Sequence, residues 1–146
     1  MQSTTSSLRI LIVDDEIDIA NSLKRFIIKS GFDAISFTDP LLALEHFTLL
    51  HNRYSVIITD LRMPGMPGLD FTNKIREINP SVRVFLISAF DTSDLENNNN
   101  YKTAKIERVI QKPIKFSIFK DILNNVLLND NNKNQLHSIK KDQAFI

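Results

Sequence analysis

The sequence places five polar side chains at the ends of short apolar segments, where they could act together. These side chains are Asp14, Asp15, Asp60, Ser88 and Lys112. Each apolar segment is short and mostly aliphatic, which is typical of a strand buried on both faces of a parallel sheet. Ligands of open α/β sheets bind beyond the carboxyl ends of the strands. We therefore expect all five side chains to lie at one edge of one sheet.

Three carboxylates gathered at one edge need positive charge beside them. Two unit charges about 4 Å apart repel by on the order of 4 kcal/mol at an effective dielectric constant near 20. Lys112 can supply one cation, and Mg²⁺ suits a site of one or two carboxylates plus waters. Because Mg²⁺ also binds phosphate oxygens, this set of residues indicates phosphoryl transfer.

The residue types suggest a role for each side chain. A carboxylate can accept a phosphoryl group and form an acyl phosphate, so Asp60 is the candidate nucleophile. In this interpretation Asp15 holds Mg²⁺ directly, and Asp14 assists directly or through water. Ser88 would donate a hydrogen bond to the phosphoryl group, and Lys112 would pair with a phosphoryl oxygen.

Each of these residues also has a simpler explanation. The acidic pair Asp14 and Asp15 could only favour the start of a helix, where the macrodipole attracts negative charge. Asp60 could begin an ordinary turn, Ser88 could cap a loop, and Lys112 could be a solvated loop residue. The site interpretation is preferred because all five positions fall on strand ends of the same predicted edge.

The remaining sequence alternates between strand and helix patterns. Strands are predicted at residues 8–13, 32–37, 54–60, 82–87 and 108–111. Apolar residues recur at helical spacing over 17–30, 41–50, 69–78 and 116–127, with Asp39 and Pro40 expected to begin the second helix. Alternation of this kind predicts parallel βαβ units in a three-layer α/β sandwich.

Composition limits the classes of protein to consider. The 146 residues carry a net charge of +1 and no cysteine, so disulfides and thiolate metal sites are excluded. We expect a disordered terminus at 1–7, one domain at 8–128 and a polar, disordered tail at 129–146. No signal peptide and no apolar run of roughly 20 residues is visible. We expect neither nucleic acid nor a membrane as a partner.

The chain resembles the receiver domains of two-component response regulators. The resemblance rests on Ile10–Glu16, Ile57–Asp70, Ile87–Ala89 and Gln111–Pro113, above all on the pattern Asp-x-x-Met-Pro-x-x-x-Gly from Asp60 to Gly68. It implies a flavodoxin-like (βα)5 fold with strand order 2-1-3-4-5. It also implies that Asp60 receives its phosphoryl group from a phosphohistidine of a sensor histidine kinase or a histidine phosphotransfer protein.

The resemblance further implies a ligand set and a signalling mode. Mg²⁺ would be held by Asp15, Asp60 and the backbone carbonyl of Arg62, with Asp14 assisting. Ser88 would move toward the phosphoryl group and so bias a two-state surface that a partner protein reads. These properties imply a cytoplasmic phosphoprotein, monomeric or a weak phosphorylation-dependent dimer, that modifies only itself and turns over no external substrate.

Two features depart from the usual family pattern. Three residues before Lys112, where the family has an aromatic residue, this chain has Val109, and Phe90 or Tyr101 could compensate. The segment between Ser88 and Lys112 contains four consecutive asparagines, Asn97–Asn100. Because asparagine is a poor helix former, we expect the helix over 91–105 to be short or distorted.

Two other functions remain to be weighed against a phosphoacceptor receiver without a DNA-binding output domain. The chain could be an interaction module with a receiver fold that binds its partner whether or not it is phosphorylated, which Val109 mildly favours. A Mg²⁺-dependent phosphohydrolase is disfavoured because such enzymes commonly have an Asp-x-Asp pair, and Arg62 stands where the second aspartate would be.

Overall fold

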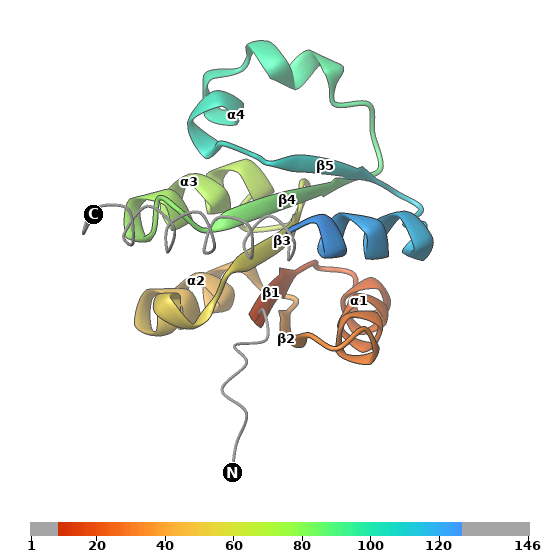
Figure 1. The fold of residues 1–146 in the computed structure, drawn as a ribbon. Helices are drawn as coiled ribbons and strands as arrows, with labels where there is room; N and C mark the ends of the chain where they lie inside the picture. Colours follow the sequence, from red (N-terminus) through yellow and green to blue (C-terminus); the bar gives the residue numbers. More distant parts are fainter. Residues whose placement is uncertain (1–8, 127–146) are drawn as a thin grey trace, which may run out of the picture. The chain divides into compact units, whose positions relative to one another are not determined.

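The structure is a computed structural model that describes residues 9–126 (Figure 1). It contains one parallel sheet of five strands: β1 (Arg9–Val13), β2 (Asp33–Phe37), β3 (Val56–Asp60), β4 (Arg83–Ser88) and β5 (Arg108–Gln111). The strand order is β2-β1-β3-β4-β5, and every pairing is parallel. The flavodoxin-like order that the resemblance implied is thereby confirmed.

Helices connect the strands, and the first three lie where the apolar spacing predicts them. They are α1 (Ile17–Lys29), α2 (Pro40–Leu50), α3 (Gly68–Ile78) and α4 (Asn99–Ala104), with 3₁₀ turns at His51–Arg53 and Ser93–Asn97. The chain divides into two compact units after Ile114, and all these elements belong to the first unit. In the second unit a helix covers residues 116–126, at the position predicted for the last helix.

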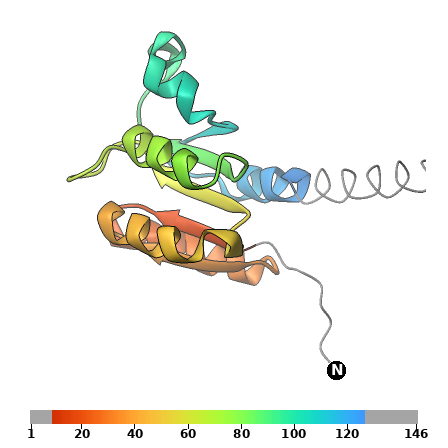
Figure 2. The same ribbon diagram turned by 90° about the vertical axis from the view of Figure 1, so that its left-hand side faces the viewer.

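Helices cover both faces of the sheet in the first unit. Figure 2 shows α2 and α3 side by side over one face, and Figure 1 shows α1 on the opposite face. The core under α2 and α3 takes alternate residues of the strands, including Leu11, Ile57 and Val84, and packs them against Phe47 and Phe71. Alternation sends the intervening residues of each strand to the other face. Both faces are therefore apolar, which explains the continuous apolar runs in the sequence.

Local signals account for the helix ends. The Asp39 carboxylate accepts a hydrogen bond from the Leu41 N–H at 2.9 Å, and Pro40 occupies the first turn, as predicted. Gly31 follows α1 with a φ of 97°, a conformation that favours glycine after a helix. These two signals set where α2 begins and where the chain turns into β2.

The segment between β4 and β5 is irregular, as the asparagine run predicts. It forms a 3₁₀ turn and a six-residue α4 instead of one long helix. The Asn98 side chain accepts from the Asn100 N–H at 2.8 Å and so begins α4 between the asparagines. The Arg76 guanidinium on α3 donates to the backbone carbonyls of Ala104 at 2.8 Å and Lys105 at 3.0 Å. Polar contacts to α3 therefore help to hold this short helix.

The predicted disorder at residues 1–7 and 129–146 lies outside the described residues, as do residues 8, 127 and 128 at the ends of the predicted domain. Within residues 9–126, no helix is long and apolar enough to cross a membrane.

Candidate functional site

The register of the sheet brings the predicted residues together. Thr59 pairs with Val13 of β1 and Asp60 pairs with Ile87 of β4, so Asp14 emerges beside Asp60. Ser88 in turn pairs with Gln111 of β5, which is followed by Lys112. The five predicted side chains thus lie at the carboxyl ends of β1, β3, β4 and β5, the edge where α/β proteins bind ligands.

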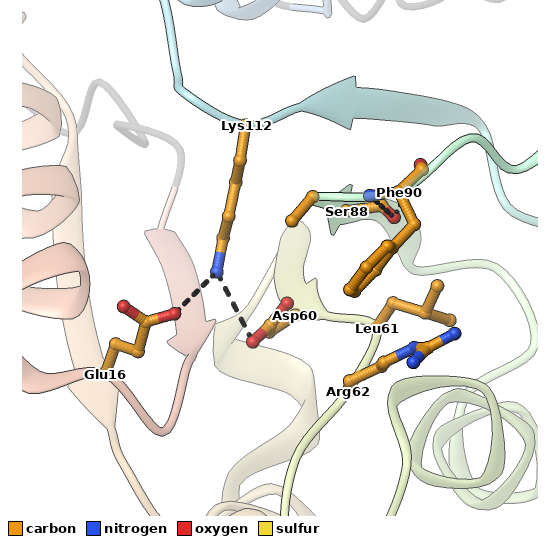
Figure 3. A pocket seen from close by; sticks show the side chains of 8 residues that line it. Glu16, Asp60, Leu61, Arg62, Ser88, Phe90 and Lys112 are labelled. Carbon is orange, nitrogen blue, oxygen red and sulfur yellow. Dashed lines mark hydrogen bonds and ion pairs between the residues drawn. The ribbon is translucent and has the colours of Figure 1, made fainter.

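Lys112 is the cation at the centre of this edge (Figure 3). Its ammonium nitrogen lies 3.3 Å from Asp14 Oδ2, 3.4 Å from Asp60 Oδ2 and 3.4 Å from Glu16 Oε1. The side chains of Asp14 and Asp60 are almost fully buried, whereas that of Glu16 is exposed. One lysine therefore compensates two buried carboxylates and one solvated carboxylate, as the charge argument requires.

Burial and mutual repulsion set the protonation of the two buried acids. Burial, followed by the charge of Asp14, raises the pKa of Asp60 from 3.8 to about 6, although Lys112 opposes this shift. Burial also raises the pKa of Asp14. Burial disfavours the charged form of Lys112, but Asp14 and Asp60 outweigh it and raise the pKa of the ammonium. Negative charge at this site is therefore in excess and favours a further cation.

The carboxylates fit a divalent metal ion. Asp14, Asp15 and Asp60 each offer an oxygen within 4.8 Å of the others. Asp14 Oδ2 is buried and, among the described residues, has the Lys112 ion pair but no well-aligned hydrogen-bond donor. Its other oxygen accepts from the Glu16 N–H at 2.9 Å, which fixes the carboxylate. A cluster of hard oxygen donors with an unsatisfied buried atom is chemically suited to Mg²⁺.

Ser88 lies on the wall of a pocket that Asp60, Arg62, Phe90 and Lys112 also line. Its hydroxyl donates to the Phe90 carbonyl at 2.9 Å and accepts from the Phe90 N–H at 3.0 Å. The predicted residue is therefore present at the site, and in the unmodified chain its one proton is committed to the backbone of Phe90.

The turn after Asp60 is packed tightly against the strand end. Gly68 donates from its N–H to the Leu61 carbonyl at 2.8 Å, which closes the turn at the start of α3. A Cβ at Gly68 would lie 2.1 Å from the Asp60 carbonyl oxygen, so only glycine fits here. This packing explains physically why the pattern that begins at Asp60 ends in glycine.

Two features of the site were not predicted from the sequence. Glu16 reaches Lys112, although it also stands at the start of α1, where an acidic residue is expected for helix stability alone. The guanidinium of Arg62 stacks over the Phe90 ring, with its central carbon 4.2 Å from the ring centroid. The sequence contains no signal for this stacking, because it depends on how two loops meet.

Val109, which stands where the family has an aromatic residue, packs away from these carboxylates. Val109 and Tyr101 belong to an apolar cluster built around Leu69, Leu86 and Ala104. Phe90 is instead the aromatic residue that lines the pocket with Asp60.

Comparison with known proteins decides the family. A family model described as "Response regulator receiver domain" matches residues 10–124, which include every predicted site residue. The chain belongs to the response regulator receiver domain family. Receiver domains are signalling modules of two-component systems, and Mg²⁺ binding, phosphoaspartate and a cytoplasmic location are typical of the family.

Individual relatives agree with this assignment. Response regulator receiver protein CpdR of Brucella abortus is 26% identical over 118 residues, which are 81% of this chain and 92% of CpdR. A crystal structure of a response regulator receiver domain protein from Clostridium thermocellum matches with a TM-score of 0.74 and 26% identity, covering 88% of this chain and 98% of that one.

Other relatives are larger than the matched region. A cyclic di-GMP phosphodiesterase of Thermotoga maritima is 29% identical over 122 residues, which are 84% of this chain, but the chain spans only 32% of that protein. The matched region of this chain covers 7% to 49% of the length of several further relatives. The similarity to these proteins therefore concerns only part of their length.

Proposed function

We propose that this receiver domain, residues 8–128, accepts a phosphoryl group on Asp60 in a Mg²⁺-dependent reaction. The observation that carries the proposal is the position of Asp60 between the ammonium of Lys112 at 3.4 Å and the carboxylates of Asp14 and Asp15. Asp60 is 6% exposed, yet it lines an open pocket from which a phosphodonor can approach.

The donor would be a phosphohistidine on a sensor histidine kinase or a histidine phosphotransfer protein, as in the family. An Asp60 oxygen would attack phosphorus and form a P–O bond. The P–N bond would break, and the imidazole nitrogen would keep its electron pair and take up a proton. The product is an acyl phosphate on Asp60.

The residues around Asp60 would each have a defined role. Asp15, Asp60 and the Arg62 carbonyl, with Asp14 assisting, would hold Mg²⁺, which neutralises charge on the phosphoryl oxygens when bound. Lys112 would pair with a phosphoryl oxygen. Ser88 would give up its bond to the Phe90 carbonyl and donate to the phosphoryl group.

The signal would be the change in conformation that follows phosphorylation. The phosphoryl group carries about 1.5 to 2 negative charges, in place of the single charge of the Asp60 carboxylate, together with strong hydrogen-bond acceptors. It does so at a site that already holds excess negative charge. Loops that carry Ser88 and Lys112 would rearrange around it, and a partner protein in the cytoplasm would read the altered surface. The protein would therefore act by binding and not by turnover of an external substrate.

Intact mass spectrometry tests the proposal. The protein is incubated with acetyl phosphate and MgCl₂, beside Asp60→Asn and the control Asp70→Asn, which changes an exposed acid on α3. We expect the mass of one phosphoryl group to be added to the native chain and to Asp70→Asn, and not to Asp60→Asn. No addition, or equal addition to all three chains, would overturn the proposal.

A further inference from the structure

Arg62 and Phe90 form a stacked pair on the wall of the phosphoacceptor pocket (Figure 3). The guanidinium carbon lies 4.2 Å from the ring centroid, within the range of a cation–π contact. Phe90 is 50% exposed, so burial in the core does not hold its ring in place. The contact with Arg62 is therefore one restraint on this ring.

The backbone of Phe90 is also the resting partner of Ser88. The Ser88 hydroxyl donates to the Phe90 carbonyl at 2.9 Å and accepts from the Phe90 N–H at 3.0 Å. Because a hydroxyl has one proton, Ser88 cannot donate to a phosphoryl group on Asp60 while this bond persists. Donation from Ser88 to a phosphoryl group on Asp60 must therefore break the hydrogen bond that ties Ser88 to the turn carrying the Phe90 ring.

We propose that the Arg62–Phe90 pair is a latch that holds Ser88 in its resting hydrogen bonds and opens when Asp60 is phosphorylated. The inference rests on the proposed phosphorylation of Asp60. Two interactions open the latch: the Ser88 hydroxyl donates to the phosphoryl group in place of the Phe90 carbonyl, and the phosphoryl charge attracts the Arg62 guanidinium away from the ring. Arg62 follows Asp60 by two residues and lines the same pocket, so it is close enough to respond.

Because Val109 stands where the family has an aromatic residue, the ring of Phe90 takes the place of that residue beside Ser88. Val109 is a short side chain that packs in the cluster with Leu86 and Ala104. It carries no ring that could change orientation when Ser88 moves. Phe90 does carry such a ring, at the end of the turn that Ser88 begins. Phosphorylation of this chain is thereby coupled to an exposed aromatic surface beside the pocket.

A single tryptophan reports the state of the latch, because the native chain contains none. Phe90→Trp preserves the cation–π contact, and indole emission changes when the ring leaves the guanidinium. We expect acetyl phosphate with MgCl₂ to move the emission of Phe90→Trp to longer wavelength. Addition of Asp60→Asn should abolish the shift. Leu49→Trp, at a residue 77% exposed on α2, is the control and should show no shift.

Two further substitutions test the coupling in the Phe90→Trp chain. Arg62→Gln should move the emission of the unmodified protein toward that of the phosphorylated protein, a change of about two- to fivefold in the latch equilibrium. Arg25→Gln, an exposed charge on α1, should leave it unchanged. Ser88→Ala should reduce the shift per phosphorylated molecule, because the hydroxyl no longer transmits the change.

Intact mass measured on the same samples separates the two proposals. If the chain gains a phosphoryl group and the emission of Phe90→Trp stays constant, the latch is wrong while the phosphoacceptor function stands. An unchanged shift in Arg62→Gln would also contradict the latch. If no phosphoryl group is added, the proposed function is wrong, and the latch is wrong as well because it depends on phosphorylation of Asp60.

Discussion

The Lys112 ammonium nitrogen lies 3.4 Å from Asp60 Oδ2, joining the end of β5 to the end of β3 across the intervening β4. Both side chains are largely buried, with 12% and 8% of their surface exposed. The pair is therefore screened only weakly by solvent, and the Asp60 carboxylate depends on Lys112 for compensation of its charge, whereas Lys112 also pairs with Asp14 and Glu16.

Removal of this cation should destabilise the fold at neutral pH. Lys112→Met leaves Asp14 and Asp60 without their shared cation, so we expect the free energy of unfolding to fall by about 1–3 kcal/mol at pH 7 in EDTA. The loss should be smaller at pH 5, where Asp60 is protonated. Urea denaturation at both pH values measures this, with the exposed Lys74→Met as the control. Equal losses in the two variants would contradict the account.

Removal of the central carboxylate should have the opposite effect on stability. The pKa of Asp60 in the folded state is about 6, above its ordinary value of 3.8. The folded state thus binds the proton more tightly than the unfolded state, and this group lowers stability as the pH rises from about 4 to about 6. We expect Asp60→Asn to raise the free energy of unfolding at pH 7 by about 1–2 kcal/mol without Mg²⁺.

The gain should nearly vanish near pH 4, where the native carboxyl is already neutral. Thermal or urea denaturation across this range checks the slope, and Asp94→Asn, at an exposed acid, should show no comparable gain. A stability gain for Asp60→Asn that is constant with pH would show that repulsion at the site is not its cause.

Mg²⁺ affinity should depend on pH because the Asp60 carboxyl takes up a proton in the same range. A metal ion competes with the proton on Asp60, so binding should tighten as the pH rises from 5 to 7 and release protons. Isothermal titration calorimetry in two buffers of different ionisation enthalpy gives both the affinity and the number of protons. We expect Asp15→Asn to weaken binding at every pH and Asp60→Asn to flatten the pH dependence. Affinity that is independent of pH in the native chain would contradict a site that includes Asp60.

Close packing at the start of α3 leads to a further prediction. A methyl group at Gly68 would collide with the Asp60 carbonyl, so Gly68→Ala should lower the free energy of unfolding by about 1–3 kcal/mol and slow phosphorylation of Asp60. Gly65 is the matched control, because it has a φ of 85° but open space around it. Gly65→Asn should cost less than about 1 kcal/mol, since asparagine tolerates this conformation. Urea denaturation and the rate of phosphorylation by acetyl phosphate, measured on both variants, distinguish Gly68→Ala from Gly65→Asn.

Much of the fold follows from local patterns. The apolar runs located the strands, and Asp39 with Pro40 located the start of α2, because these signals act within a few residues. The order of the strands came only with the family resemblance, since apolar runs do not specify which strands are neighbours. The irregular α4 was expected from the asparagines, whereas its attachment through Arg76 was not, because that contact joins residues 28 positions apart.

The residues of the candidate site could also be predicted only in part. Asp14, Asp60, Ser88 and Lys112 could be predicted because each follows an apolar run, and parallel strands end at a common edge. The resting partner of Ser88 and the stacking of Arg62 on Phe90 could not, because they depend on the conformations of two loops. Glu16 was visible as an acid beside Asp15, but a helix start explained it equally well.

Chemical trapping of the modified residue shows whether Asp60 is the phosphoacceptor. Borohydride reduces an aspartyl acyl phosphate to homoserine, so the protein is treated with acetyl phosphate and MgCl₂, reduced, digested and sequenced by mass spectrometry. Conversion of Asp60 to homoserine, dependent on Mg²⁺ and lost when Lys112→Met removes the ammonium, is the predicted result. Homoserine at another aspartate, or an unmodified Asp60 in a protein that has gained a phosphoryl group, would contradict it.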